Sequence, residues 1–384
     1  MKDLDILKNA GWNADVPPNG FINRPKTIAN NDNPDGLSSA VAEIEIETTP
    51  EHMNLVSGDP GCASWTRAYD DPGVVGLREH LRANNGIKGL ELVSPDDPKR
   101  AAELFHRDGF VAVRDVLDPD QIQRMQAAAY KAVAELMEDD RDCSAGGGSA
   151  SRHMLHVDEW CELIDLPTTT PILTEIFGSA DYVVGGAGGD IAMPGAIEYQ
   201  GLHSDNMWSE IPDPYGNVTM RDLPVPVLTI NFPMSDLTFE NGPIRQIPGT
   251  QRSRAPIPSL ANEPEWMKLS TVCPAPVGTA IFRDIRAWHG GTPNLSREVR
   301  AMPNVEYYAP WFRSEGIMRS MPYAQWEKLS PHAQRISRYV VCDKGEEVVG
   351  AGFMDPRRKK RAAFKQKQLD AMGEKAAREY LARL

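Results

Sequence analysis

The chain has 384 residues, 41% of them hydrophobic, which allows one large β-rich domain with extensions and excludes a globally disordered protein. Its formal net charge of −13 disfavours a nucleic acid partner, and no apolar run approaches the roughly 20 residues that span a bilayer. Because the N-terminus lacks a signal-like apolar stretch and the five cysteines form no Cys-x-x-Cys pair, we expect a cytoplasmic protein with reduced thiols and no membrane association.

Residues 1–94 are predicted to form an N-terminal extension wrapped on the main body. They are rich in Pro, Gly, Asn and Asp, and the stretch 30–39 is typical of a loop. Strict alternation of apolar and acidic residues over 42–47 suits a half-exposed strand.

The core domain is predicted to span residues 95–345 and to open with helices. In chain order, the sequence predicts a helix over 97–109, a strand over 110–113, a helix from 118, a flexible loop over 146–149 and a helix over 170–178. Asp-Pro or Thr-Pro pairs at the starts and glycines at the stops carry the helix predictions.

Beyond residue 180 the apolar period changes from helical to strand-like. The strand-like runs are 182–184, 196–199, 227–230, 279–282 and 305–308. Helices followed by short strands predict a mainly β fold, a sandwich or barrel braced by helices on one side. The glycine stretch 185–189 is not followed by a helix signal, so we expect a sheet turn or bulge there rather than a phosphate-binding loop.

Residues 346–384 are predicted to form a basic amphipathic helix. Residues 355–384 hold ten Lys or Arg and four Asp or Glu, and apolar residues recur near helical spacing from Phe364 to Tyr380. Because the rest of the chain is acidic, we expect this helix to dock on the body of the protein or on a second subunit of a homo-oligomer. A nucleic acid or membrane patch is the alternative.

A candidate metal site begins with the H-x-D segment His203-Ser204-Asp205. On a strand, residues two apart point to the same face, so the imidazole and the carboxylate can converge on one ion. His289 lies 86 positions later and offers a third ligand. Two imidazoles and one carboxylate suit Fe(II) oxygen chemistry. An isolated H-x-D is a weak signal, because His156-Val157-Asp158 repeats it.

Arg300 strengthens this interpretation. It stands eleven residues after His289, at the start of a strand-like run. A guanidinium fork is the natural partner of a buried carboxylate. A dicarboxylate cosubstrate would therefore chelate the metal at one end and meet Arg300 at the other.

Four stretches of the chain resemble the phytanoyl-CoA dioxygenase (PhyH) family of Fe(II)/2-oxoglutarate-dependent oxygenases. They are 105–117, 203–205 with Gln200 three residues earlier, 240–250 and 289–300, and they occur in the family's order. Gln251 departs from the pattern, because many members have a histidine there; we expect this difference to affect packing rather than chemistry. The Asn-Gly pair in 240–250 we interpret as a structural turn.

The resemblance implies a double-stranded β-helix (jelly roll, cupin-like) core braced by α-helices, with the iron site inside its open end. Three residues would be iron ligands: His203, Asp205 and His289. Four residues would bind or adjoin the cosubstrate: Arg300 at the distal carboxylate of 2-oxoglutarate, Gln200, Thr292 and Ser296. For Thr292 and Ser296, a role as ordinary turn residues is the alternative.

The expected activity is Fe(II)- and 2-oxoglutarate-dependent oxidation, foremost hydroxylation, of a small molecule by O₂, with release of succinate and CO₂. Relatives that transfer halogen have a small residue in place of the carboxylate, so Asp205 favours hydroxylation, desaturation or rearrangement. Two alternatives stay open: a cupin-like metalloenzyme that does not use 2-oxoglutarate, for which Arg300 would have no role, and a non-catalytic β-sandwich binding module.

The substrate itself is not predicted. The candidate pocket residues are Trp208, Met207, Trp160 and His156. For each of them an ordinary structural role is an equal alternative.

Overall fold

The computed structural model of the chain describes residues 12, 22–23, 65–66, 68–139, 148–150, 154–197, 199–205, 213, 215–260, 262–312 and 319–346. The strand predicted over 42–47 and nearly all of the basic helix predicted over 346–384 lie outside the described residues. The division into an extension, a core and a tail therefore stays a prediction.

The helices predicted from Pro and Gly signals are confirmed. Helix α3 (Pro98–Asp108) begins where the Asp97 carboxylate accepts a hydrogen bond from the Arg100 amide (3.1 Å), and it ends at Gly109, whose φ is 82°. Helix α6 (Thr170–Phe177) ends at Gly178 with φ 64°. The other helices are α2 (Pro72–Asn84), α4 (Pro119–Asp139), α5 (Asp158–Glu162), α7 (Glu265–Lys268), α8 (Tyr323–Trp326) and α9 (Pro331–Ile336).

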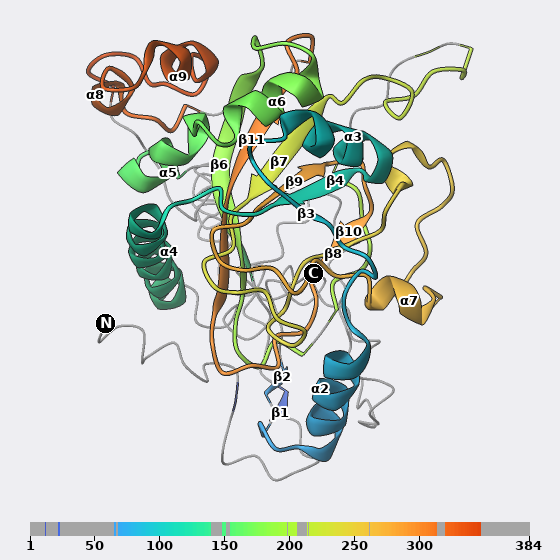
Figure 1. Cartoon of the computed structure of the whole chain (residues 1–384). Helices are drawn as coiled ribbons and strands as arrows, with labels where there is room; N and C mark the ends of the chain where they lie inside the picture. The colour runs from blue at the N-terminus through green and yellow to red at the C-terminus, as the bar shows by residue number, and fades with distance from the viewer. Residues whose placement is uncertain are drawn as a thin grey trace, which may run out of the picture.

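A large, mostly antiparallel sheet forms the centre of the molecule (Figure 1). In spatial order its strands are β3 (Leu92–Val93), β4 (Phe110–Val113), β9 (Ala280–Asp284), β7 (Val227–Asn231), β11 (Arg300–Tyr308), β6 (Val183–Ala192) and β5 (Gly148–Ala150). Only the pair β3–β4 is parallel. Strands far apart in sequence are therefore neighbours, as in a jelly roll. A separate antiparallel pair joins β1 (Ile22–Asn23) to β2 (Trp65–Thr66).

A smaller sheet is built around β8 (Arg245–Gln246) and β10 (His289–Gly290), which pair antiparallel. Single bridges extend it on both sides, from His289 to His203 and from Arg245 to Thr271. Segments near residues 203, 289, 245 and 271 thus lie side by side, while the strands between them in sequence belong to the large sheet. This alternation between two sheets is the double-stranded β-helix that the family resemblance implies.

Helices cover one face of the large sheet (Figure 1). The main hydrophobic cluster joins alternate residues of β11, such as Val305 and Tyr307, to helix residues such as Phe105 and Ile172. Because side chains alternate across a strand, the even-numbered residues of β11, from Arg300 to Tyr308, point to the other face, toward the smaller sheet.

The space between the two sheets is apolar at both ends and polar in the middle. One end is filled by Phe110, Ala112, Leu237, Ile244, Val272, Ile281 and Met302. The other end is filled by Val183, Val227, Ile285 and Tyr308. Strand register places the side chains of Thr229, Asn231, Arg283 and Glu306 on the same inward face, between these two clusters. Polar groups buried in such a band need partners, and the candidate site lies beside it.

The two glycine-rich segments, 146–149 and 185–189, differ in how well the sequence predicts them. The loop predicted over 146–149 is wrong in its second half, because Gly148–Ala150 forms β5, paired with β6. Pairing with a distant strand is invisible to a local composition signal. The bulge predicted over 185–189 is confirmed, since Glu306 faces Gly186 and Tyr307 faces Val184, which leaves Gly185 as the extra residue. The run 196–199 lies outside the named strands, although Asn294 donates to the Ala196 carbonyl (2.7 Å).

The bulge gives a stability prediction. A Cβ added at Gly185 would overlap the ring of Tyr308. We expect Gly185→Ala to lower the free energy of unfolding by about 1–3 kcal/mol, as overpacking does. Gly76→Ala is the matched control: Gly76 lies exposed inside α2 with open space where a Cβ would stand, so this change should raise stability by up to about 1 kcal/mol. Urea denaturation measures both, and equal effects would contradict the packing at Gly185.

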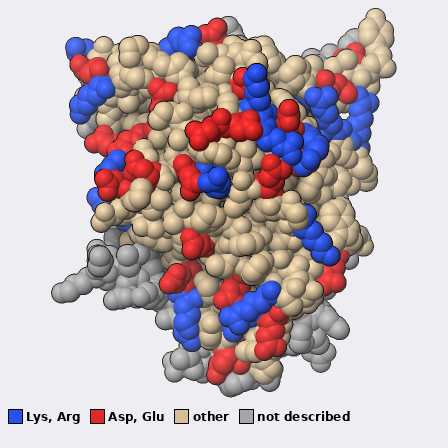
Figure 2. Space-filling model, in the orientation of Figure 1, with Lys and Arg blue, Asp and Glu red and all other residues tan. Residues whose placement is uncertain are grey.

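On the face of the molecule that Figure 2 shows, neither acidic nor basic side chains of the described residues form a patch of a single charge. Figure 2 shows acidic and basic side chains intermixed over it. Among the described residues, no helix is both long and apolar enough to cross a membrane. Part of the N-terminal region contacts the barrel: the Trp12 indole donates to the Ser296 carbonyl (2.9 Å) and packs near Ile197 and Leu295.

Candidate metal centre

His203 and His289 face each other across the smaller sheet. Their backbones exchange two hydrogen bonds, each 3.0 Å, and their rings lie 4.2 Å apart between centroids. The Nδ1 of His203 lies 3.1 Å from the Gly201 carbonyl, and the Nδ1 of His289 lies 2.9 Å from the Ala287 carbonyl. A carbonyl only accepts hydrogen bonds, so each Nδ1 carries a proton and Nε2 is the ring nitrogen left to bind a metal.

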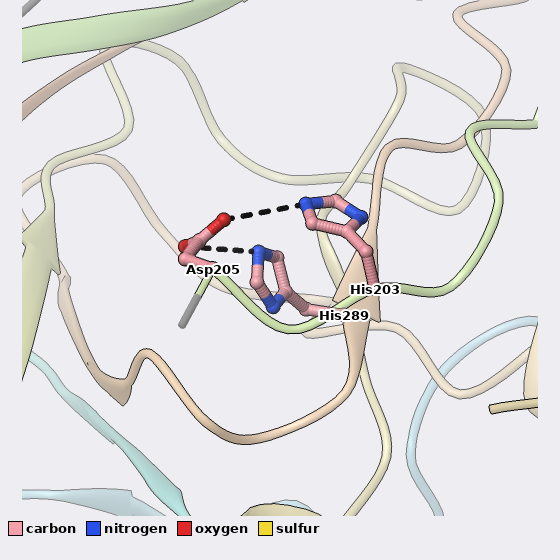
Figure 3. A group of neighbouring side chains, drawn as sticks. All are labelled: His203, Asp205 and His289. Atoms are coloured by element: carbon pink, nitrogen blue, oxygen red, sulfur yellow. Dashed lines mark ion pairs between the residues drawn. The ribbon is translucent and has the colours of Figure 1, made fainter. Parts of the chain in front are cut away.

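Asp205 completes a cluster in which all three ligand atoms lie within 4.8 Å of one another. Its Oδ1 is 3.5 Å from Nε2 of His203, and its Oδ2 is 3.3 Å from Nε2 of His289 (Figure 3). The Asp205 amide donates to the Ile285 carbonyl (2.9 Å), which fixes the carboxylate at the end of the inward-facing segment. The predicted H-x-D geometry is thus achieved by an irregular segment with a single bridge rather than by a regular strand.

The charges of the cluster suit metal binding. Burial, and then the positive charge of Arg283, lower the pKa of His289 to about 4, so this imidazole is neutral at neutral pH. Desolvation by itself raises the pKa of Asp205, but its electrostatic interactions with His289 and with the Arg283 guanidinium outweigh it and hold this pKa well below its ordinary value. The cluster therefore combines a neutral imidazole with an ionised carboxylate, the protonation states that metal ligands require.

The spacing also fits a metal ion. Bonds of about 2.1 Å place adjacent donors of an octahedral site about 3 Å apart, close to the two ion-pair distances. The His289 side chain is 6% exposed, whereas His203 and Asp205 are 34% and 29% exposed. Two imidazoles and a carboxylate on one side, with access retained, form the facial set that suits non-haem Fe(II). Among the described residues, no other group of this kind occurs.

Arg300 lies at the start of β11 on the face that points between the sheets. Its side chain is buried, with Nε donating to the Gly242 carbonyl (2.9 Å) and Nη1 to the Asp190 carbonyl (3.1 Å). Burial lowers the pKa of Arg300 to about 10, so it remains charged at neutral pH. Within the described part of the chain, it forms no ion pair and its Nη2 has no hydrogen-bond partner. A buried cation with a free donor is suited to receive a carboxylate.

Comparison with known proteins agrees with this geometry. A family model for phytanoyl-CoA dioxygenase (PhyH) matches residues 105–302, more than half of the chain. The chain belongs to the phytanoyl-CoA dioxygenase family. Members of the PhyH family are Fe(II)/2-oxoglutarate-dependent oxygenases, and the matched region contains the three cluster residues and Arg300. The PhyH-family chain is also 26% identical to dioxygenase trt7 of Aspergillus terreus over 259 residues, which are 62% of this chain and 83% of that protein.

Solved structures with a similar arrangement include AviO1 from Streptomyces viridochromogenes, with a TM-score of 0.44 and 19% identity over 57% of this chain and 97% of that one. Another is SnoN, a non-haem alpha-ketoglutarate-dependent epimerase from nogalamycin biosynthesis, with a TM-score of 0.41 and 19% identity over 58% of this chain and 86% of that one.

Two of the other predicted cosubstrate neighbours of the PhyH-family chain, Gln200 and Thr292, contact segments beside His289 or Arg300. Gln200 accepts a hydrogen bond from the Gly291 amide through Oε1 (2.9 Å), two residues from His289. Thr292 donates to the Pro243 carbonyl (2.6 Å). Pro243 directly follows Gly242, whose carbonyl accepts a hydrogen bond from Arg300. Ser296 donates to Asn294 Oδ1 (2.7 Å) in the turn before β11, and its place near the cosubstrate stays a prediction.

Of the four candidate substrate residues, the structure describes Trp160 and His156. Met207 and Trp208 lie outside the described residues. Trp160 belongs to the main hydrophobic cluster, and its indole donates to the Gly188 carbonyl (2.6 Å). His156 precedes α5 and accepts a hydrogen bond from Gln325 through its carbonyl (2.7 Å). A role for them in substrate binding stays a prediction.

Two buried side chains add to the sequence interpretation. Gln251 donates through Nε2 to the carbonyls of His106 (3.0 Å) and Arg107 (3.3 Å) at the end of α3, so its contacts are with packing elements, as expected.

The sequence interpretation missed Arg283, whose Nη1 lies 3.1 Å from Asp205 Oδ2. Its position directly after the strand-like run 279–282, two residues from Ile281, signals the inward face but not the contact with a metal ligand.

Proposed function

We propose that this PhyH-family chain is an Fe(II)- and 2-oxoglutarate-dependent dioxygenase that hydroxylates a small-molecule metabolite with O₂, releasing succinate and CO₂. One observation carries the proposal: the space between the two sheets holds both a facial set of two imidazoles and a carboxylate and the buried cation Arg300, which forms no ion pair with the residues that the structure describes. A metal site alone would fit many reactions. The added cation selects a cosubstrate that carries a carboxylate remote from the metal.

The donor set fits iron, with His203, Asp205 and His289 as the residues that would hold it. Bound iron would supply the O₂ chemistry, for which the protein needs no side-chain general base. The carbonyls of Gly201 and Ala287 keep both imidazoles in the tautomer that presents Nε2. Arg300 would bind the distal carboxylate of 2-oxoglutarate, and the apolar clusters at both ends of the interior would limit entry of water.

Succinate release tests this proposal. With Fe(II), 2-oxoglutarate and O₂, addition of a metabolite extract should stimulate succinate formation, and fractionation should follow the stimulation to one class of compound. Omission of Fe(II) should abolish it. If no extract stimulates succinate formation and 2-oxoglutarate is never consumed, the chain is not a 2-oxoglutarate-dependent oxygenase. The relative named a dioxygenase supports the expected reaction class.

A further inference from the structure

Gln246 lies on β8 with its side-chain amide buried. Its side chain is fully buried, and neither Oε1 nor Nε2 has a hydrogen-bond partner among the described residues. Most buried polar groups in native proteins are satisfied, because leaving them unpaired is costly. An amide of this kind points to a bound molecule as its partner.

The side chain of Gln246 points into the space between the sheets. Gln246 stands directly opposite His289 in the register of β8 and β10, and residues opposite each other in an antiparallel pair share a face. Ile244, two residues earlier, packs in the interior cluster, whereas Ile247 packs on the outer side with Leu202 and Trp288. The amide therefore lies on the face that carries the His289 imidazole.

Arg283 approaches the same cluster from the large sheet. It is 5% exposed, and its Nη1 lies 3.1 Å from Asp205 Oδ2 without meeting hydrogen-bond geometry. Its Nε has no partner within the described part of the chain either. Register places Arg283 opposite Thr229, on the inward face. Two buried donors of a charged group thus adjoin the cluster on the side away from the smaller sheet.

We propose that Gln246 and Arg283 bind the carboxylate of 2-oxoglutarate that adjoins its keto group, while Arg300 binds the distal carboxylate. A carboxylate only accepts hydrogen bonds, so the Gln246 Nε2 and the Arg283 guanidinium are complementary to it. Charge-assisted bonds of this type are the stronger ones. The cosubstrate would then be held at both ends by side chains as well as by the metal. This inference rests on the proposed function.

Anaerobic titration of the Fe(II)-loaded protein tests the pair, with the visible absorption band of the 2-oxo acid complex as the signal. Gln246→Leu is expected to raise the dissociation constant of 2-oxoglutarate by about 10-fold or more, the effect of losing a hydrogen bond to a charged group. Gln246→Glu should raise it further, because the new carboxylate repels the ligand. Pyruvate lacks the distal carboxylate, and its binding should be weakened by the same factor.

Controls separate this role from a general effect on folding. Gln251 is also a buried glutamine with an unpartnered Oε1, but it contacts the end of α3, so Gln251→Leu should leave both acids bound as in the wild type. Arg283→Gln should weaken both acids, with Fe(II) affinity measured first to detect an effect through Asp205. Unchanged affinities in Gln246→Leu and Gln246→Glu would overturn the inference while the wild-type band upholds the proposed function. A wild type without any band would overturn both.

Discussion

His289→Ala is expected to lower Fe(II) affinity by more than about 100-fold and to abolish 2-oxoglutarate turnover, since even a group that only orients a metal ligand is worth 10- to 100-fold. His289 is buried, and its Nε2 lies 3.3 Å from Asp205 Oδ2. Its backbone hydrogen bonds to His203 do not involve the imidazole, so the sheet should persist. Anaerobic calorimetry with Fe(II) measures the affinity.

The second H-x-D of the chain provides the control. His156→Ala should bind Fe(II) with wild-type affinity, because neither His156 nor Asp158 belongs to the ligand cluster among the described residues. Thermal unfolding of both variants without metal shows whether the fold survives. Wild-type Fe(II) affinity in His289→Ala, or an equal loss in His156→Ala, would place the metal elsewhere.

Arg300→Gln is expected to raise the dissociation constant of 2-oxoglutarate by about 30-fold or more, because truncating one partner of a buried charge pair costs about 2–5 kcal/mol. Pyruvate has no distal carboxylate and should bind Arg300→Gln as it binds the wild type. Titration of the anaerobic Fe(II) complex with each acid measures the two constants. Equal weakening of both acids would mean that Arg300 acts on the metal end of the site.

The loss of Arg300 also removes the donors to the Gly242 and Asp190 carbonyls, so stability must be controlled. Arg78 is a matched arginine outside the site: it is buried in α2 and donates to the carbonyls of Leu295 and Tyr69, each at 3.1 Å. Arg78→Gln should destabilise the fold by about 1–3 kcal/mol, as loss of buried hydrogen bonds does, and leave 2-oxoglutarate affinity unchanged. Weakened 2-oxoglutarate binding in Arg78→Gln would make the Arg300 result a folding effect.

Local signals in the sequence predict the helices because their starts and stops are local. Asp97 and Gly109 cap α3 through contacts within one turn, so the sequence suffices. The strand β5 was missed because its residues carry no strand signal and its partner, β6, lies about 40 residues away. The jelly-roll topology came from the family resemblance, since no local pattern shows that segments near 203, 289 and 245 pair.

In the candidate site, too, some features follow from local sequence patterns and others do not. H-x-D geometry is a sequence property, and the structure brings the ligand atoms of His203, Asp205 and His289 within 4.8 Å of one another. The roles assigned to these residues and to Arg300 stay predictions. Arg283 and Gln246 were missed because their significance lies in hydrogen bonds that they lack, which depends on every residue packed around them. Conversely, Trp160 carries an aromatic signal in the sequence, but the structure places it in the main hydrophobic cluster.

We propose that His203, Asp205 and His289 hold iron in a site that also receives a 2-oxo acid. Anaerobic addition of Fe(II) and 2-oxoglutarate, followed by visible absorption, tests it most directly. A weak charge-transfer band should appear in the wild type and be absent from His289→Ala. A wild type that binds Fe(II) but gives no band with 2-oxoglutarate would show that this metal site does not receive the 2-oxo acid.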